Sequence, residues 1–337
     1  MKRIKELMAD SEIEALTPAD GMTSASRASD SIWHPAPALS EKPLRVHILA
    51  LGDVGMTMLL GLRLLGADRI GTIGIYDIKQ ENLERLEMEI NQIRSPEPAA
   101  QMPPVEIITE EELFCCDVFI FTASRGVPDL SHVGDVRMAQ LKANQTLITY
   151  YGALARRTGY TGQICIVSDP VDPLCKAFLK ASRCNPGQIR GFGLGVMNAR
   201  AAYYAERDPR FRLYLTEGRV YGPHGTGLIV ADSVAHYHDD VSRELTDLVI
   251  NANLKVRALG YKPYIAPALS SAALSILALL RGEWHYSSLY LGSEEEGAFL
   301  GIRNRMTSFG NEAEDLPLPD ELYHRILRSY QELLQID

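Results

Sequence analysis

The chain has 337 residues and a formal net charge of −9 at pH 7, so nucleic acids and anionic membranes, which attract basic proteins, are not expected partners. Hydrophobic residues make up 46% of it and charged residues 23%, as in ordinary soluble globular proteins of one large or two medium domains. None of its five cysteines belongs to a C-x-x-C pair, so we expect reduced thiols in a cytoplasmic protein and no metal site.

The first 43 residues differ in composition from the rest of the chain. Residues 17–43 are rich in Ser, Pro, Ala and Asp, and their hydrophobic residues follow no period. Such a segment cannot bury enough apolar surface to order itself. We therefore predict a flexible N-terminal arm over residues 1–43, with docking of a partner protein as the alternative role.

Residues 44–190 alternate regularly between short apolar runs and amphipathic runs. The apolar runs predict strands at 44–51, 71–77, 105–109, 117–123, 146–151 and 164–168. The amphipathic runs predict helices at 54–67, 79–93, 135–143 and 169–182. Strands that alternate with helices through short links form crossover units, so we predict an α/β domain with a doubly wound parallel sheet.

Residues 191–337 are mostly helical in pattern and predict a second, α+β domain. Helical runs cover residues 197–207, 238–259, 265–282 and 320–335, and two strands are expected at 285–292 and 297–306. The longest apolar stretch, 264–280, has only 17 residues and contains three serines. A packed helix explains this stretch better than a membrane span.

A glycine-containing turn, "ALGDVG", follows the first strand and opens the first helix of the α/β domain. Gly52 allows close approach of a pyrophosphate, and Gly55 allows helix and strand to pack. Asp77 ends the second strand 25 residues after Gly52, where an acid binds a ribose 2′-hydroxyl. Because an acid there repels a 2′-phosphate, the pattern predicts NAD rather than NADP.

Four polar residues further along each have a structural and a functional interpretation. Asp169 precedes Pro170 as a helix N-cap would, yet it also follows a strand at the edge where ligands bind. Arg137 and Arg200 are either surface arginines or guanidinium groups that bind a carboxylate in pairs of hydrogen bonds. His224, between glycines in "VYGPHGTGL", is either a turn residue or a proton donor in a cleft.

Taken in order, the motifs resemble those of the lactate/malate dehydrogenase family over about residues 44–335. "ALGDVG" is similar to the family's G-x-G-x-x-G, "VSDPVD" to its S-N-P-V-D, "MNAR" to its D-S-A-R and "YGPHG" to its G-E-H-G. The resemblance implies a Rossmann-type NAD-binding domain over 44–190 and a substrate domain over 191–337. It also implies a small carboxylate substrate and a homodimer or homotetramer.

The resemblance implies roles for individual residues. His224 is the expected acid/base, Arg200 the expected clamp on the substrate carboxylate, and Arg137 the group that polarises the carbonyl. The positions that contact the substrate side chain are expected near Asp129 and Leu130, in a loop that departs from the family pattern. The residues expected to bind the cofactor are Gly52, Asp53, Val54, Gly55, Asp77, Thr122 and Ala123.

Three departures from the family pattern bear on activity. Ala50 stands where the first glycine of the turn is usual, Met197 where the aspartate that orients the histidine is usual, and Asp169 where asparagine is usual. We hypothesise that Asp169 replaces the lost aspartate as the charge partner of His224 and favours its protonated form. The alternative is that Asp169 only caps the helix and that catalysis has been abandoned.

These observations lead to two candidate functions. The first is an NAD-dependent oxidoreductase that interconverts a 2-hydroxy acid and a 2-oxo acid, with an altered active site. A monocarboxylate, or a substrate with a positive group, is expected rather than malate or oxaloacetate, because the loop offers no evident second arginine. The second is a catalytically degenerate homologue that binds NAD and acts as a sensor or scaffold.

Overall fold

The computed structural model describes residues 1–15, 34, 36, 39–97, 101–125, 136–293 and 296–336. Its strands are β1 (Leu44–Leu49), β2 (Ile70–Tyr76), β3 (Val105–Ile107), β4 (Val118–Phe121), β5 (Gln163–Ile166), β6 (Ile189–Gly191), β7 (Arg219–Tyr221), β8 (Ile229–Ala231), β9 (His285–Gly292), β10 (Gly297–Thr307) and β11 (Gly310–Ala313).

The α-helices are α1 (Leu7–Ala15), α2 (Asp53–Leu65), α3 (Gln80–Gln92), α4 (Val136–Thr158), α5 (Val171–Ser182), α6 (Leu194–Ala205), α7 (Tyr214–Glu217), α8 (Asp239–Ile250), α9 (Ala252–Ala258), α10 (Leu274–Leu280) and α11 (Asp320–Leu334). Short 3-10 turns are η1 (Ile4–Glu6), η2 (Pro186–Gln188) and η3 (Pro209–Phe211), and a π-helical segment, η4 (Pro267–Ala273), leads into α10.

One nine-stranded sheet runs through the molecule in the order β11-β10-β9-β6-β5-β4-β1-β2-β3. The six strands from β3 to β6 are parallel, as the crossover pattern predicts, and their order is that of a doubly wound dinucleotide-binding sheet. The antiparallel strands β9, β10 and β11 extend it, joined where Gly191 of β6 pairs with Ser288 of β9. The predicted fold class is therefore confirmed, and the domain boundary that we propose at residue 190 falls within β6.

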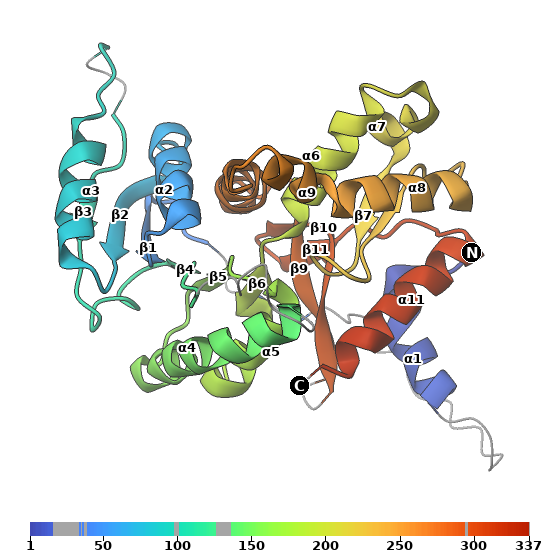
Figure 1. Cartoon of the computed structure of the whole chain (residues 1–337). Coiled ribbons are helices and arrows are strands. Elements are labelled where there is room, and N and C mark those ends of the chain that lie inside the picture. Colours follow the sequence, from blue (N-terminus) through green and yellow to red (C-terminus); the bar gives the residue numbers. More distant parts are fainter. Residues whose placement is uncertain are drawn as a thin grey trace.

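Helices cover both faces of the parallel strands (Figure 1). On one face α2, α3 and α10 bury an aliphatic cluster that includes Ile48, Leu62 and Leu277. On the other face α4 and α5 bury a more aromatic cluster that includes Phe121 and Phe178. Because both faces are covered, the central strand β4 is apolar and buried along its whole length, as parallel strands often are.

The second half of the chain packs its own helices around the small β7–β8 ribbon. α6 and α8 enclose a cluster with these two strands that includes Met197, Val230 and Leu245. α11 covers the antiparallel strands, where Tyr323 and Tyr330 are fully buried. These elements bring the β7–β8 loop, which holds His224, next to the start of α5.

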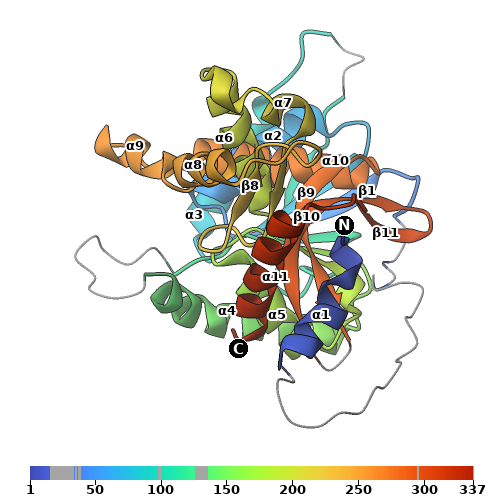
Figure 2. The same ribbon diagram turned by 90° about the vertical axis from the view of Figure 1, so that its right-hand side faces the viewer.

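The N-terminal residues depart from the prediction of a flexible arm. Residues 4–15 are helical, and Ile4 and Leu7 are buried against α11 (Figure 2). Lys2 pairs with the backbone of Leu318, and its ammonium group lies 2.6 Å from Asp10. The prediction is wrong here because Ile4 and Leu7 supply apolar surface that α11 can bury, while residues 16–33 lie outside the described part.

Two other elements differ from their predicted form. Residues 146–151 are the middle of α4 and not a strand, and the predicted helix 238–259 is divided into α8 and α9 at Asn251. Within the described ranges, no helix combines the length and the apolar character that crossing a membrane requires.

Candidate functional site

The turn between β1 and α2 holds residues at the carboxyl edge of the parallel sheet. Ala50 has a φ of 73°, a left-handed conformation that glycine adopts without strain. A Cβ on Gly55 would overlap the carbonyl oxygen of Ala50, so this glycine permits the close packing of helix and strand. A Cβ on Gly52 would meet nothing within 4 Å, so the backbone at the start of α2 is open to a ligand.

Asp77 lies beside this turn and fixes it. Its carboxylate accepts hydrogen bonds from the backbone N–H groups of Leu51, at 2.6 Å, and Lys79, at 3.0 Å. Asp53, in the first turn of α2, is paired with Lys262 at 3.0 Å. Lys262 belongs to the second half of the chain, so this exposed pair spans the two halves next to the open end of α2.

The ends of β4 and β5 complete the same edge of the sheet. The Thr122 hydroxyl lies 2.6 Å from the carbonyl of Ala50, and the Ala123 carbonyl accepts a hydrogen bond from Ser168. Asn144, buried in α4, accepts from the N–H of Arg125 and donates to the carbonyl of Asp169 at 2.9 Å. The Asn144 side chain therefore fixes the backbone that follows β4 and the backbone that follows β5.

His224 is held so that one ring nitrogen faces away from its support. Its Nδ1 lies 2.8 Å from the carbonyl of Gly193, which only accepts, so Nδ1 carries the hydrogen. The same carbonyl accepts from the buried Ser271 hydroxyl at 2.8 Å, which in turn accepts from the N–H of Val196. A Cβ on Gly193 would lie 2.5 Å from the Cβ of His224, so only glycine lets the imidazole sit there.

A second carboxyl group, Asp172, supports the backbone of His224. It is buried at the start of α5, and its Oδ2 accepts from the N–H of His224 at 3.3 Å. Its Oδ1 has no hydrogen-bond partner among the described residues. Burial raises the pKa of Asp172 to about 7. Both residues line a cavity of about 200 Å³ that is closed on one side by α11.

Asp169 lies on the opposite side of the imidazole from Gly193. Its Oδ1 is 3.8 Å from Nε2 of His224, and its side chain is 48% exposed. The N-cap of α5 is Pro170, and Asp169 makes no capping hydrogen bond. The capping interpretation is therefore wrong, since the carboxylate faces the histidine.

Arg200 is a partly buried cation on α6 without a carboxylate within 4.0 Å in the described part of the chain. Its Nη1 lies 3.4 Å from the Val249 carbonyl and 3.7 Å from the sulfur of Met197. Burial lowers the pKa of Arg200, and Tyr204 and, to a smaller extent, Asp169 oppose that shift. Asp169 is thus close enough to act electrostatically on both Arg200 and His224.

Other predicted residues lie at the limits of the described chain. Val54 is in the first turn of α2, and Arg137 is in the first turn of α4, where only its backbone is described. Asp129 and Leu130 lie outside the described residues. In the ranges that are described, no group of three or more His, Cys, Asp or Glu side chains forms a possible metal site.

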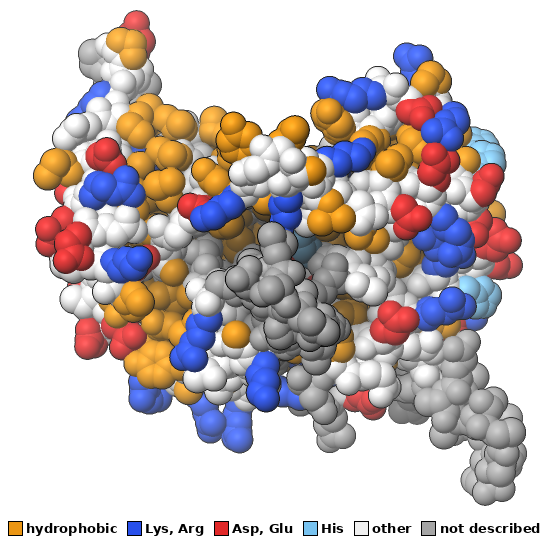
Figure 3. Space-filling model, viewed as in Figure 1, with side chains coloured by type: hydrophobic (Ala, Val, Ile, Leu, Met, Phe, Trp, Pro, Cys, Tyr) orange, Lys and Arg blue, Asp and Glu red, His pale blue; other side chains and the backbone are white. Residues whose placement is uncertain are grey.

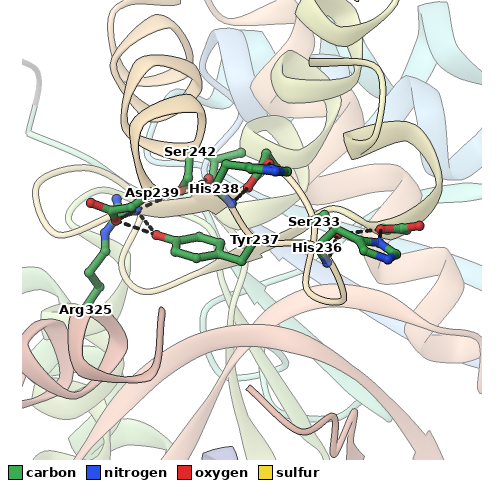
Figure 4. Close-up of polar contacts among 10 residues, drawn as sticks. Ser233, His236, Tyr237, His238, Asp239, Ser242 and Arg325 are labelled. Atoms are coloured by element: carbon green, nitrogen blue, oxygen red, sulfur yellow. Dashed lines mark hydrogen bonds and ion pairs between the residues drawn. The ribbon is translucent and has the colours of Figure 1, made fainter. Parts of the chain in front are cut away.

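A separate group of polar side chains in the β8–α8 loop serves the fold (Figure 4). The Tyr237 hydroxyl donates to Asp239 at 2.7 Å and accepts from Arg325 of α11 at 2.6 Å. Two histidines are each paired with a carboxylate, His236 with Glu217 at 2.9 Å and His238 with Asp232 at 3.0 Å. The contacts of Arg325 fasten α11 to α8, and the His236 pair fastens the loop to α7. Because these groups satisfy one another, we do not assign them to the candidate site.

Sequence reasoning missed four residues that position the site: Asn144, Asp172, Gly193 and Ser271. Asp172 is the last residue of the "VSDPVD" motif, so the motif could have identified it. Gly193 acts through its carbonyl, which every residue has, so no sequence signal marks it.

Comparisons with known proteins show which proteins the chain resembles. No family model matches the chain. Over 197 residues it is 28% identical to an L-lactate dehydrogenase of Treponema denticola, a match that covers 58% of this chain and 59% of that protein. The chain therefore aligns with less than two thirds of that relative's length.

Solved structures match over more of the chain. The minor L-lactate dehydrogenase of Enterococcus mundtii superposes with a TM-score of 0.71 at 20% identity, over 86% of this chain and 96% of that one. The malate dehydrogenase of Archaeoglobus fulgidus, solved in complex with NADH, gives a TM-score of 0.68 at 19% identity, over 86% and 97% of the two chains. These matches establish a shared fold.

Proposed function

We propose, on the premise that the chain is a divergent lactate/malate dehydrogenase-like protein, that it is an NAD-dependent oxidoreductase which interconverts a 2-hydroxy acid and a 2-oxo acid. The observation that carries this proposal is the arrangement at His224. Its Nδ1 is held by Gly193, which leaves Nε2 3.8 Å from Asp169, and Arg200 lies on α6, the helix that Gly193 caps.

The residues of the glycine turn fit a dinucleotide. The open backbone at Gly52 and the N-terminus of α2 would hold the pyrophosphate, with Asp53, Val54 and Gly55 in the same turn. Asp77 would hold the ribose, and Thr122 and Ala123 would line the wall beside it. NAD bound there supplies hydride transfer to or from the substrate.

The chain's own side chains would bind the substrate and move one proton. Arg200 would bind the substrate carboxylate, because its guanidinium has no carboxylate of the described chain to pair with. Nε2 of His224 would exchange a proton with the substrate oxygen. Arg137, at the start of α4, would polarise the carbonyl, and Asp129 and Leu130 would contact the substrate side chain.

Asp169 remains our proposed charge partner for His224, although it acts from an unexpected side. The family aspartate that Met197 replaces orients the histidine, and here the Gly193 carbonyl does this at Nδ1. Asp169 lies 3.8 Å from Nε2, so its carboxylate would face the imidazolium that forms when His224 takes a proton. Five free thiols fit the reducing cytoplasm, where we propose that the chain acts.

The proposal is tested with a panel of 2-oxo acids and NADH, followed at the nicotinamide absorbance. Turnover of at least one acid is expected, and an Asp169→Asn variant should lose at least tenfold in turnover. Turnover in that variant equal to or above the wild type would end the partnership of Asp169 with His224. If the wild type binds NADH but turns over none of the acids, the result would favour the second candidate function, a degenerate homologue.

That second candidate is a degenerate homologue that binds NAD and acts as a sensor or scaffold. The observation in its favour is Met197, which is buried and offers His224 no charge. In a serine protease, neutralising the aspartate that orients the catalytic histidine lowers the rate by about 10⁴. A neutral carbonyl at Nδ1 is a weaker partner than that carboxylate, so a large loss of rate is expected under this alternative.

A further inference from the structure

We propose that the substrate of this cleft is a zwitterion, namely a 2-hydroxy or 2-oxo acid that carries an ammonium group on the carbon next to the reacting one. The inference rests on the proposed function, since it names the substrate class of the same site. It is carried by two side chains of opposite charge, Arg200 on α6 and the half-exposed Asp169 beside His224.

The positive side of the cleft is Arg200. A partly buried guanidinium is unfavourable unless an anion compensates it, and the groups around its Nη1 are a carbonyl and a thioether. In the part of the chain that the structure describes, no carboxylate lies within 4.0 Å of it. A substrate carboxylate is the anion that this position fits.

The negative side of the cleft is Asp169. Asparagine at this position would offer an amide N–H to the substrate oxygen, whereas a carboxylate only accepts hydrogen bonds. The residue is well fixed, because Asn144 donates to its backbone carbonyl at 2.9 Å, and its side chain is half exposed. A second carboxylate on the substrate would be repelled here, and a cation would be attracted.

The position of this negative charge limits where the substrate cation lies. Oδ1 of Asp169 is 3.8 Å from Nε2 of His224, the atom that would exchange a proton with the oxygen on the reacting carbon. A group on the next carbon along the substrate lies within a few ångströms of that oxygen. The ammonium group is therefore expected on that carbon and not at the far end of a long side chain.

Three small acids that differ in one group test the inference. Isoserine (3-amino-2-hydroxypropanoate), 2-hydroxybutanoate and malate carry an ammonium, a methyl and a carboxylate group at the same place. Calorimetry on the full chain saturated with NAD⁺ should give the tightest binding for isoserine, by at least tenfold over 2-hydroxybutanoate, with malate the weakest. An Asp169→Asn variant should bind isoserine and 2-hydroxybutanoate within threefold of each other.

Two further variants control for indirect effects. Asp169→Glu keeps the charge and should keep most of the preference for isoserine. Asp240→Asn removes an exposed carboxylate in the first turn of α8 and should leave all three affinities unchanged. Equal binding of isoserine and 2-hydroxybutanoate by the wild type, a preference that survives in Asp169→Asn, or binding of none of the acids would overturn the inference.

The inference and the proposed function fail separately in this design. NADH binding, followed by its fluorescence, tests the cofactor on which the proposed function depends. If NADH does not bind, the proposed function fails, and calorimetry without cofactor still measures the preference among the three acids. If NADH binds and the preference is absent, only the zwitterion is overturned.

Discussion

At position 50 the backbone adopts a conformation that suits glycine, yet the residue is alanine. The φ of 73° places its Cβ close to the backbone, which costs about 1–2 kcal/mol in a left-handed conformation. The turn keeps this conformation because the carbonyl of Ala50 packs against Gly55 and lies 2.6 Å from the Thr122 hydroxyl. Strain at this position is therefore imposed by the start of α2 and by Thr122, which follows β4.

We predict that Ala50→Gly raises the free energy of unfolding by roughly 0.5–1 kcal/mol. The relief of strain is partly offset because glycine gains freedom in the unfolded chain. Ala153→Gly, at an exposed position of α4, is the control and should lower the free energy of unfolding by about 1 kcal/mol. Urea denaturation of both variants measures the two effects. If both substitutions change the free energy of unfolding in the same direction, Ala50 is not strained.

Asp172 predicts a pH dependence of stability. Its pKa is raised from 3.8 to about 7 by burial, so the native state keeps its proton in a range where the unfolded chain has lost it. The free energy of unfolding therefore falls as the pH rises from about 4 to about 7. The total contribution is roughly 4 kcal/mol, at 1.36 kcal/mol for each pH unit.

The test compares wild type with Asp172→Asn in urea denaturation at pH 4.5 and pH 8. The difference in free energy of unfolding between the two proteins should shift in favour of the variant at the higher pH. Asp240→Asn, which removes an exposed carboxyl group, should show no such shift. Parallel curves for wild type and Asp172→Asn would show that the buried carboxyl group titrates normally.

At the scale of elements, α4 marks the limit of what sequence patterns can predict. The run 146–151 contains threonine, isoleucine and two tyrosines, which favour strands. Its buried positions nevertheless follow a helical spacing that continues through Leu141, Ile148, Tyr151 and Ala155. Packing of that face against α5 and β4 makes this segment helical. A pattern of six residues carries no information about that packing.

Parts of the candidate site were predictable where the local backbone geometry requires a particular type of residue. Gly55 and Asp77 belong to that class, since a close contact and a hydrogen-bonded acid follow from their places after β1 and β2. The support of His224 was not predictable, because it comes from a carbonyl on β6–α6 and a hydroxyl on η4. Those contacts join segments more than 30 residues apart and depend on the packing of the second half.

Helix α1 gives a prediction at the same scale. Leu7 is fully buried against α11, so Leu7→Ala should lower the free energy of unfolding by roughly 2–4 kcal/mol. Lys5→Ala removes an exposed side chain that is 3.3 Å from Asp315 and should cost less than about 1 kcal/mol. A Leu7 variant as stable as the wild type, in urea denaturation, would mean that α1 is only loosely attached.

For the whole molecule, we predict a homo-oligomer that uses the helix layer around α2. Leu64 and Leu65 at the end of α2 are 48% and 50% exposed, and Leu274 of the adjacent α10 is 48% exposed. Hydrophobic side chains also gather over α2 on the surface in Figure 3. Apolar side chains gathered in this way on a protein surface mark an interaction site, and a second copy of the chain is the partner we expect.

Sedimentation equilibrium tests this expectation. The wild type should sediment as a multiple of the 37.3 kDa chain, and Leu65→Arg should shift it toward the monomer. Leu215→Arg, at an exposed position of α7, is the matched control and should leave the mass unchanged. A monomeric wild type at micromolar concentration would exclude the predicted assembly.

The single sheet that crosses both halves of the chain also restricts how the molecule moves. Gly191 of β6 pairs with Ser288 of β9, so a hinge motion of one half away from the other would break this pairing. We therefore expect ligands to enter through movements of side chains and surface segments, while the sheet itself stays rigid. Small-angle scattering curves recorded with and without bound ligand should then give the same radius of gyration.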